Sequence, residues 1–408
     1  MKIALVTQYF WPESFTINEI VQVLVEQGHT VEVFTAKPNY PDGDIFPGYS
    51  AKGVTQENYI GGVQVNRVPL SPRGQGGAKN LVKNYLSFVI NGVRYFPKMT
   101  KDKEFDVIFV FTLSPITSVL PAIWLKWKMR KHLAIWVLDL WPESLSATGY
   151  VKNKFALKIV EQLVKFIYAC SDTILVQSHA FIDAVGKYAD KKKIIYYPNS
   201  YLEPEVCVDN DVSQELLTTL ENNFCVVFAG NLGKAQSLPT LVDAAEKLRD
   251  LSNFKLILLG SGSMSSWLEE QITQRNLSNL VLPGRFPAEQ MPAYFNKAGC
   301  LLVSLGKDDI LAKTVPAKIQ SYLAAGRPIL ASIDGEAAKV VDASGAGYSS
   351  AAEDVDGLVQ NILKMYHLSE SERAEMGKRG REYFLENFEM HKQVTNLINI
   401  LQERISNK

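Results

Sequence analysis

The chain is poor in the residues that build disulfide-rich or zinc-binding proteins. Its 408 residues include only four cysteines and five histidines. The cysteines form no CxxC pair, and the histidines show no metal-ligand spacing. We therefore expect no disulfide framework, no metal site, and a chain that works in the reducing cytoplasm.

Several other signatures are absent. The chain contains neither a P-loop of the form GxxxxGK[ST] nor a GxGxxG fingerprint, which disfavours a plain ATP or dinucleotide site. The N-terminus, MKIALVTQYFWPES, lacks a signal-peptide cleavage pattern. The uncharged run 107–125 has the length of a membrane span, but Pro115 and Pro121 interrupt it. A buried strand, a turn and the start of a helix explain this run better.

The formal net charge is zero, but the two halves of the chain differ in sign. Residues 1–200 carry 23 Lys and Arg against 16 Asp and Glu, and residues 201–408 carry 20 against 27. A basic N-terminal half suits anionic lipid or a phosphorylated acceptor, and we expect no nucleic-acid partner. Chance variation between two solvated surfaces remains the alternative.

Alternating strands and helices dominate what is present. Lys2–Thr7 is a short apolar run typical of a strand buried on both faces. Apolar residues at helical spacing follow it, Gly28 is placed to end that helix, and Val31–Thr35 is a second strand. This strand–helix–strand spacing predicts a parallel sheet.

The alternation of strands and helices continues to the end of the chain. We predict strands at 107–112, 133–138, 173–177 and 194–197, a polar linker near 199–214, and a second series of strands from Cys225 onwards. The predicted fold class is α/β, with two Rossmann-like doubly wound domains facing across a cleft. We place the first domain at 1–200 and the second at 201–385.

Glycine-containing turns follow successive strands of the second half. Gly230-Asn231 and Lys234 follow the first strand, Gly260 and Gly262 the second, and Arg285 the third. Glycine lets backbone approach a ligand, and the amides of a helix start attract anions. Each turn alone is equally explained as an ordinary strand-to-helix connection, but three in succession favour a phosphate site.

The segment Val315–Leu330, VPAKIQSYLAAGRPIL, predicts a helix with Pro316 in its first turn and Gly326 at its C-terminal cap. Packing explains its apolar residues. It does not explain Lys318 near the helix start, where free amides attract an anion. We therefore predict that the start of this helix binds an anion, with Lys318 as the cation.

Here the chain resembles a known family. The motifs LVSL, TVPAKIQSYLAAGRPIL, DGE and GAG resemble the donor half of family-four glycosyltransferases of the GT-B fold. TQYFWPES, QGHTVEVFTA, PNYP and DLWPES resemble a subgroup that includes colanic-acid transferases and the L-fucosamine transferases of O-antigen assembly. The resemblance covers nearly the whole chain and implies retaining transfer from a UDP-sugar, with no obligatory metal or other cofactor. It implies an acceptor-binding domain at 1–200 and a nucleotide-sugar-binding domain at 201–385, with a C-terminal helix at about 386–408 packed back on the first. It also implies that Thr314, Lys318, Ser321 and Tyr322 belong to the donor-binding site, together with the glycine turns.

The chain departs from the family pattern in its donor half. Most members hold the diphosphate with Arg and Lys in a G-R-L-x-x-x-K turn, where this chain has Asn231 and Gln236, leaving Lys234 as the cation. Members also carry two glutamates eight residues apart, and those positions here are Lys313 and Ser321. We expect Lys318 near the phosphates and Ser321 or Tyr322 near the ribose.

In the N-terminal half, DLWPES directly follows a predicted strand. Asp139 or Glu143 is placed to orient an acceptor hydroxyl or take its proton, although an acid pair capping a proline turn is an alternative. The resemblance implies that Glu13 and Ser14 occupy the loop that approaches the transferred sugar, with Glu13 a further catalytic candidate and Ser14 on the sugar side. Asn18 lies nearby, although a place on a helix face is also open.

Two stretches combine aromatic and basic residues: Lys79–Lys103 and Trp124–His132. This mixture favours the lipid headgroup region, although a basic surface over a packed helix fits equally well. The leading prediction is transfer of an N-acetylated or 6-deoxy sugar such as L-FucNAc to a lipid-linked glycan at the inner face of the bacterial plasma membrane. A nucleotide-sugar epimerase and a nucleotide-sugar-binding regulator are the rivals.

Overall fold

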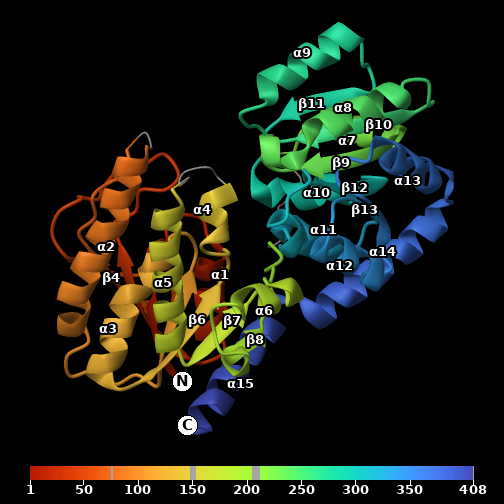
Figure 1. The fold of residues 1–408 in the computed structure, drawn as a ribbon. Helices are drawn as coiled ribbons and strands as arrows, with labels where there is room; N and C mark the ends of the chain where they lie inside the picture. The colour runs from red at the N-terminus through yellow and green to blue at the C-terminus, as the bar shows by residue number, and fades with distance from the viewer. Residues whose placement is uncertain (75–76, 148–152, 205–211, 408) are drawn as a thin grey trace. The chain divides into compact units, whose positions relative to one another are not determined.

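The computed structural model describes residues 1–74, 77–147, 153–204 and 212–407. The chain divides into two compact units, which are Met1–Pro198 with Met390–Lys408, and Asn199–Glu389 (Figure 1). Most of the acidic residues of the predicted linker lie in 205–211, outside the described residues. The described linker residue Tyr201 donates a backbone hydrogen bond to the carbonyl of Phe388, within the second unit.

The first unit is built on an eight-stranded sheet in the order β3-β4-β2-β1-β5-β6-β7-β8. All neighbouring strands are parallel except the pair β3–β4. The strands are β1 (Lys2–Val6), β2 (Thr30–Ala36), β3 (Thr55–Asn58), β4 (Gln64–Val68), β5 (Val107–Thr112), β6 (His132–Val137), β7 (Thr173–Val176) and β8 (Ile194–Tyr196).

Helices cover both faces of this sheet. α3 packs against α2 and α5 as one layer, while α15 packs against α1 (Figure 1). The helices are α1 (Thr16–Glu26), α2 (Ala78–Met99), α3 (Leu120–Met129), α4 (Glu143–Ala147), α5 (Lys154–Cys170), α6 (His179–Val185) and α15 (Met390–Ser406).

The second unit contains a six-stranded, wholly parallel sheet in the order β11-β10-β9-β12-β13-β14. The strands are β9 (Phe224–Ala229), β10 (Phe254–Leu259), β11 (Leu280–Gly284), β12 (Cys300–Ser304), β13 (Ile329–Ser332) and β14 (Gly347–Ser350). The helices are α7 (Gln214–Asn222), α8 (Leu238–Lys247), α9 (Ser265–Arg275), α10 (Met291–Phe295), α11 (Ala317–Ala324), α12 (Glu336–Ser344), α13 (Val355–His367) and α14 (Glu370–Asn387).

The two sheets confirm the predicted α/β class with doubly wound topology. Strand order reverses at β1, which lies between β2 and β5, and again at β9, which lies between β10 and β12. Every residue of β5 and of β6 is buried, as expected for strands covered on both faces. Open sheets of this kind bind ligands beyond the carboxyl ends of the strands, at the reversal point.

The run 107–125 is a strand, a short 3-10 helix and the start of α3, as predicted. No helix in the described part of the chain is long and apolar enough to cross a membrane. α3 ends at Met129, because Arg130 adopts a left-handed conformation (φ 55°) and His132 begins β6. The C-terminal tail is two helices, because the chain leaves helical geometry at Phe388.

Candidate functional site

Two glycine turns meet closely at the carboxyl ends of β9 and β10. Gly230 donates its amide to the carbonyl of Leu259 at 2.8 Å, and the amide of Gly260 reaches the carbonyl of Gly284 at the same distance. A Cβ on Gly260 would lie 1.9 Å from the oxygen of Gly230, and one on Gly262 would lie 2.4 Å from the oxygen of Leu232. These glycines are therefore required for the two turns to touch.

Lys318 lies against this pair of turns, on the first turn of α11. A Cβ on Gly230 would lie 2.6 Å from its Cε and 2.9 Å from its Nζ. The ammonium sits 3.6 Å from the centroid of the Phe228 ring. Among the described residues it has no hydrogen-bonding or ion-pair partner. Burial lowers the pKa of this lysine to about 7, so an anion placed beside it would favour its charged form.

The structure thus brings together Gly230, Gly260, Gly262 and Lys318 from the predicted donor site. Asn231 joins them, since its Oδ1 would lie 2.7 Å from a Cβ on Gly262. The sequence did not indicate Phe228, whose ring lies beside the lysine ammonium. Phe228 belongs to an unbroken apolar strand, so no pattern in the sequence separates it from ordinary core residues.

Other predicted donor residues lie at the same edge of the sheet but make different contacts. Lys234 is exposed at the start of a 3-10 helix, and Arg285 is exposed immediately after β11. The Thr314 hydroxyl donates to the carbonyl of Ile310 at 3.1 Å, and the Ser321 hydroxyl donates to the carbonyl of Lys318 at 3.0 Å. In this state both hydroxyls stabilise their own backbone.

Tyr322 lies inside the second unit, between α11 and β9. Its side chain is buried, and its hydroxyl accepts a hydrogen bond from the amide of Ala229 at 2.9 Å. That amide belongs to the last residue of β9, so Tyr322 fixes α11 against the strand that carries the Gly230 turn. This contact holds the helix that carries Lys318 against β9, and the Tyr322 hydroxyl faces the strand.

In the first unit, Glu13 is enclosed by the backbone of its own loop and of the loop after β2. Its carboxylate accepts hydrogen bonds from the amides of Phe10 (3.1 Å), Asn39 (2.9 Å) and Tyr40 (2.8 Å). Burial raises the pKa of Glu13 to about 7 against the opposing effect of these amides. This geometry makes Glu13 the residue that joins the two loops.

Asn18 and Ser14, which were predicted to lie near the sugar with Glu13, occupy different surroundings. Asn18 lies in the first turn of α1, accepts from the amide of Trp11 at 3.0 Å and donates to the carbonyl of Glu13 at 2.7 Å. Both hydrogen bonds close the loop on the start of α1. Ser14 is exposed at the tip of the same loop.

An aromatic cluster that the sequence analysis missed surrounds this loop. Phe15 stacks on Tyr9 with ring centroids 5.5 Å apart and lies 5.2 Å from Tyr40. Trp11 lies 5.6 Å from Tyr59, and both Trp11 and Tyr40 are exposed. Aromatic faces with polar tips suit a polar, ring-shaped ligand. The residues are scattered over three loops, so only the fold gathers them.

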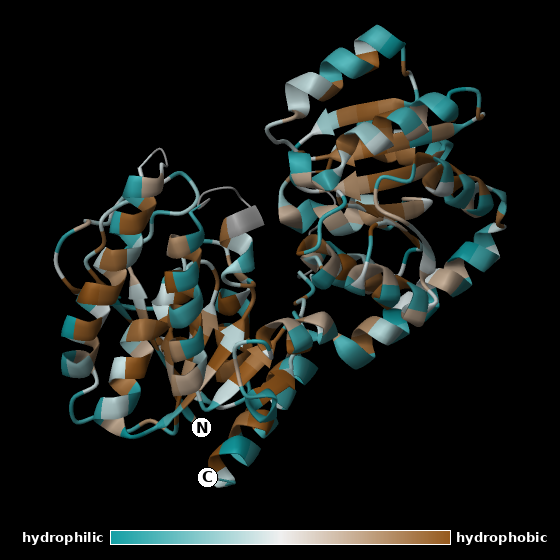
Figure 2. Ribbon diagram, viewed as in Figure 1, coloured by the Kyte–Doolittle hydropathy of each residue, from teal (hydrophilic) through white to brown (hydrophobic). Residues whose placement is uncertain are grey.

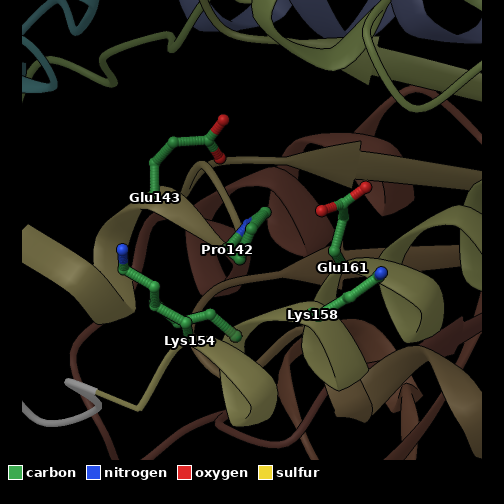
Figure 3. A pocket seen from close by; sticks show the side chains of 6 residues that line it. Pro142, Glu143, Lys154, Lys158 and Glu161 are labelled. Atoms are coloured by element: carbon green, nitrogen blue, oxygen red, sulfur yellow. The ribbon is translucent and has the colours of Figure 1, made fainter.

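Asp139 and Glu143 both follow β6. The Asp139 carboxylate accepts from the amide of Ser114 (3.1 Å) and from its hydroxyl (2.7 Å), which in turn accepts from the indole of Trp141 (3.1 Å). Glu143 begins α4 and accepts from the Tyr188 hydroxyl at 2.9 Å. It also lines a cavity of about 320 Å³ with Lys154 and Lys158 of α5 (Figure 3). Glu143 is thus the predicted acid with access to a cavity.

Comparison with known proteins identifies the family to which the two units belong. Residues 212–383 match the family described as glycosyl transferases group 1, and residues 14–200 match the glycosyl transferase 4-like domain. The chain belongs to the family-four glycosyltransferases of the GT-B fold. The match to residues 14–200 spans β2 to β8 of the first unit, and the match to 212–383 spans the whole sheet of the second.

Individual relatives of this glycosyltransferase are distant. WcaI of Escherichia coli (strain K12), described as a colanic acid biosynthesis glycosyl transferase, is 23% identical over 318 residues, which is 76% of each chain. Sucrose-phosphate synthase from Thermosynechococcus elongatus has a TM-score of 0.74 at 15% identity, with each chain covered completely. HepE from Anabaena, crystallised with UDP, has a TM-score of 0.66 at 12% identity over 99% of this chain and all of the other.

In this glycosyltransferase the two positions of the family's glutamate pair lie on either side of Lys318. Lys313 ends a 3-10 helix before α11, and Ser321 lies one turn after Lys318. Neither position supplies a carboxylate. The site at the Gly230 turn therefore offers one half-buried cation, backbone at close approach and exposed amide and hydroxyl groups, which is the chemistry of an anion site.

Proposed function

We propose that this glycosyltransferase transfers a sugar, with retention, from a UDP-sugar to a lipid-linked oligosaccharide in the synthesis of a bacterial surface polysaccharide. The observation that carries the proposal is the Lys318 ammonium, placed against Gly230 where the turns after β9 and β10 meet. A ligand diphosphate at this position would meet a cation that has no protein anion beside it.

Two kinds of similarity support the choice of donor and pathway. Structures similar to this chain include complexes with UDP, UDP-glucose and UDP-2-fluoro glucose. The relatives WcaI and WcaL are both described as colanic acid biosynthesis glycosyltransferases. An N-acetylated or 6-deoxy donor sugar such as L-FucNAc agrees with the missing glutamate pair, because such sugars present different hydroxyls.

The chemical role of Lys318 follows from its surroundings. Negative charge develops on the diphosphate as the bond to the sugar breaks, and a fixed positive group aimed at it lowers the barrier. Because the lysine is packed on Phe228 and Gly230, it is already positioned and loses little entropy when the donor binds. We propose that this cation and the surrounding amides suffice without a resident metal.

The acceptor would bind to the first unit. The exposed rings of Trp11 and Tyr40 offer faces for an acceptor sugar, and Ser14 offers a hydroxyl nearby. Glu143 lines the cavity shown in Figure 3 and is the carboxylate best placed to orient an acceptor hydroxyl. Asp139, held by Ser114, would position the loop that carries Glu143.

The test is a transfer assay with a panel of UDP-N-acetylhexosamines and a lipid-diphosphate sugar, read by mass spectrometry. We expect one donor to give a product heavier by one sugar, with the anomeric configuration of the donor kept in its NMR spectrum. Release of UDP without a new glycan would contradict the proposal. Interconversion of the donor without acceptor would instead favour an epimerase.

A further inference from the structure

Exposed large hydrophobic side chains are concentrated on one helix layer of the first unit. Of the twelve such side chains among the described residues, seven lie on α2, α3 and α5, with exposed fractions between 44% and 72%. They are Val82, Leu86, Ile90, Trp127, Phe155, Ile159 and Phe166. Single exposed apolar residues are ordinary, but seven on three adjoining helices require an explanation.

On α2 the exposed residues form a stripe. Val82, Leu86 and Ile90 follow one another at intervals of four residues, and the same spacing continues to the exposed Arg94 and Lys98. A different face of α2, which includes Phe88 and Phe96, is buried in the core of the unit. The outward aliphatic stripe therefore contributes nothing to the packing of α2 on the sheet.

The stripe on α5 has the same character. Phe155, Ile159 and Phe166 are exposed, while Val164 and Ile167 supply the buried face. The ring of Phe166 contacts Trp127 of α3, with centroids 6.5 Å apart. Since α3 packs against both α2 and α5, the three helices form one continuous layer, along which Figure 2 shows apolar segments between polar ones.

The charge on this layer has one sign. α2, α3 and α5 together carry nine Lys and Arg and a single acid, Glu161, which pairs with Lys165 at 2.6 Å. Lys126 pairs with Asp172 at 2.8 Å. Within the described residues, the other cations form no ion pair; they are Lys79, Lys83, Arg94, Lys98, Lys128, Lys154 and Lys158.

We propose that the α2–α3–α5 layer docks on an anionic lipid bilayer, with its exposed apolar side chains inserted at the headgroup level. This inference deepens the proposed function and rests on it for the lipid-linked acceptor. Apolar stripes flanked by unpaired cations match the interface of an anionic membrane, where lysine and arginine stems reach past the inserted side chains to the headgroups. Trp127 suits the same depth.

The same charge argues against a second copy of the chain as the occupant. An isologous contact would place this layer against itself and bring like charges together. The layer also includes Lys154 and Lys158, which line the cavity beside Glu143. Docking here would therefore bring the acceptor's headgroup to the cavity from the bilayer on which the protein rests.

The test is vesicle flotation of the full-length protein without any sugar donor, so that its outcome is independent of transfer. Vesicles of phosphatidylcholine alone are compared with vesicles that also contain phosphatidylglycerol. We expect the unaltered protein to float with the anionic vesicles only, and to release as salt screens the charges. The double variant Ile90→Ser, Phe155→Ser should bind at least about tenfold more weakly.

The matched control is Val54→Ser, Ile60→Ser, which removes two exposed apolar side chains of the same unit outside the layer. It should bind vesicles as the unaltered protein does, and circular dichroism should show that both variants are folded. Equal binding to neutral and anionic vesicles, or an equal loss in the control, would overturn the proposal. So would an Ile90/Phe155 variant that changes only self-association. A protein that floats but transfers no sugar would contradict the proposed function and leave this inference standing.

Discussion

The two units share a sheet topology but differ on their surfaces. Both sheets place their first strand between the second and the fourth parallel strand of the unit, with doubly wound order. Yet eleven of the twelve exposed large hydrophobic side chains among the described residues belong to the first unit, and only Leu385 belongs to the second. The first half of the chain is also the basic one.

This difference shows where function resides in a repeated fold. The sheets and their buried strands set the positions of the loops, and the loops and outer helix faces carry the chemistry. In the second unit the loops form an anion site around Gly230 and Lys318. In the first unit they gather aromatic rings and acids, and one helix layer is apolar and basic. The proposed donor and the proposed lipid-linked acceptor would each bind one of these two different surfaces.

The largest expected effect concerns the contact between the glycine turns. Gly260→Ala places a Cβ 1.9 Å from the oxygen of Gly230 at a φ of 150°, so the turns must separate. We expect the second unit to lose about 3–5 kcal/mol of unfolding free energy, measured by urea denaturation. The first-unit control Gly48→Ala has a φ of 85° and nothing within 4 Å, so it should lose only about 1–2 kcal/mol. Equal losses would mean that the turns do not need their close contact.

The next effect separates the two candidate cations of the donor site. Lys318→Ala should weaken UDP binding by about 10- to 100-fold in calorimetry, because it removes a positioned, charged hydrogen-bond donor. Lys234→Ala should cost less, since that side chain is exposed and more of its interaction is screened by water. A larger loss with Lys234→Ala would mean that Lys234, the cation of the turn after Gly230, contacts the diphosphate more strongly than Lys318 does.

Much of this site could be predicted from the sequence, and the remainder shows what pattern alone cannot supply. Glycines after successive parallel strands converge because the strand ends share one edge of the sheet, so Gly230 and Gly260 were predictable. Lys318 was predictable from the start of its helix. The roles of Tyr322 and Glu13 were not, because a polar residue that bonds buried backbone has the same sequence signature as one that contacts a ligand.

The sequence analysis also did not predict β3, β4 and β14, for a similar reason. β3 and β4 read TQEN and QVNRV, and β14 reads GYSS, without the apolar run or clean alternation that predicts a strand. They lie at or beside the edge of their sheets, where pairing with a neighbouring strand decides their conformation. The exposed stripe on α2 was equally hidden, since periodicity alone gives two apolar faces and does not say which one meets the core.

The pH dependence of donor binding gives the third effect. Burial lowers the pKa of Lys318 to about 7, and a diphosphate selects the protonated lysine. As pH rises through 7 the free protein loses this proton, so UDP affinity should fall by about tenfold between pH 6 and pH 8. Lys318→Arg keeps its charge throughout and should flatten the profile. Identical profiles for the two proteins, measured by calorimetry in several buffers, would remove Lys318 from the diphosphate site.

The smallest effect tests whether Tyr322 belongs to the framework or to the ligand. Tyr322→Phe leaves the buried amide of Ala229 without its partner and should cost the second unit about 1 kcal/mol of unfolding free energy. Under conditions in which the variant is fully folded, its UDP affinity should change by less than about threefold. The reason is that the hydroxyl faces the strand and the ring still supports α11. An unchanged stability with a large loss of UDP affinity would instead place the hydroxyl on the ribose. Contact with the ribose would then require α11 to move away from β9 when the donor binds.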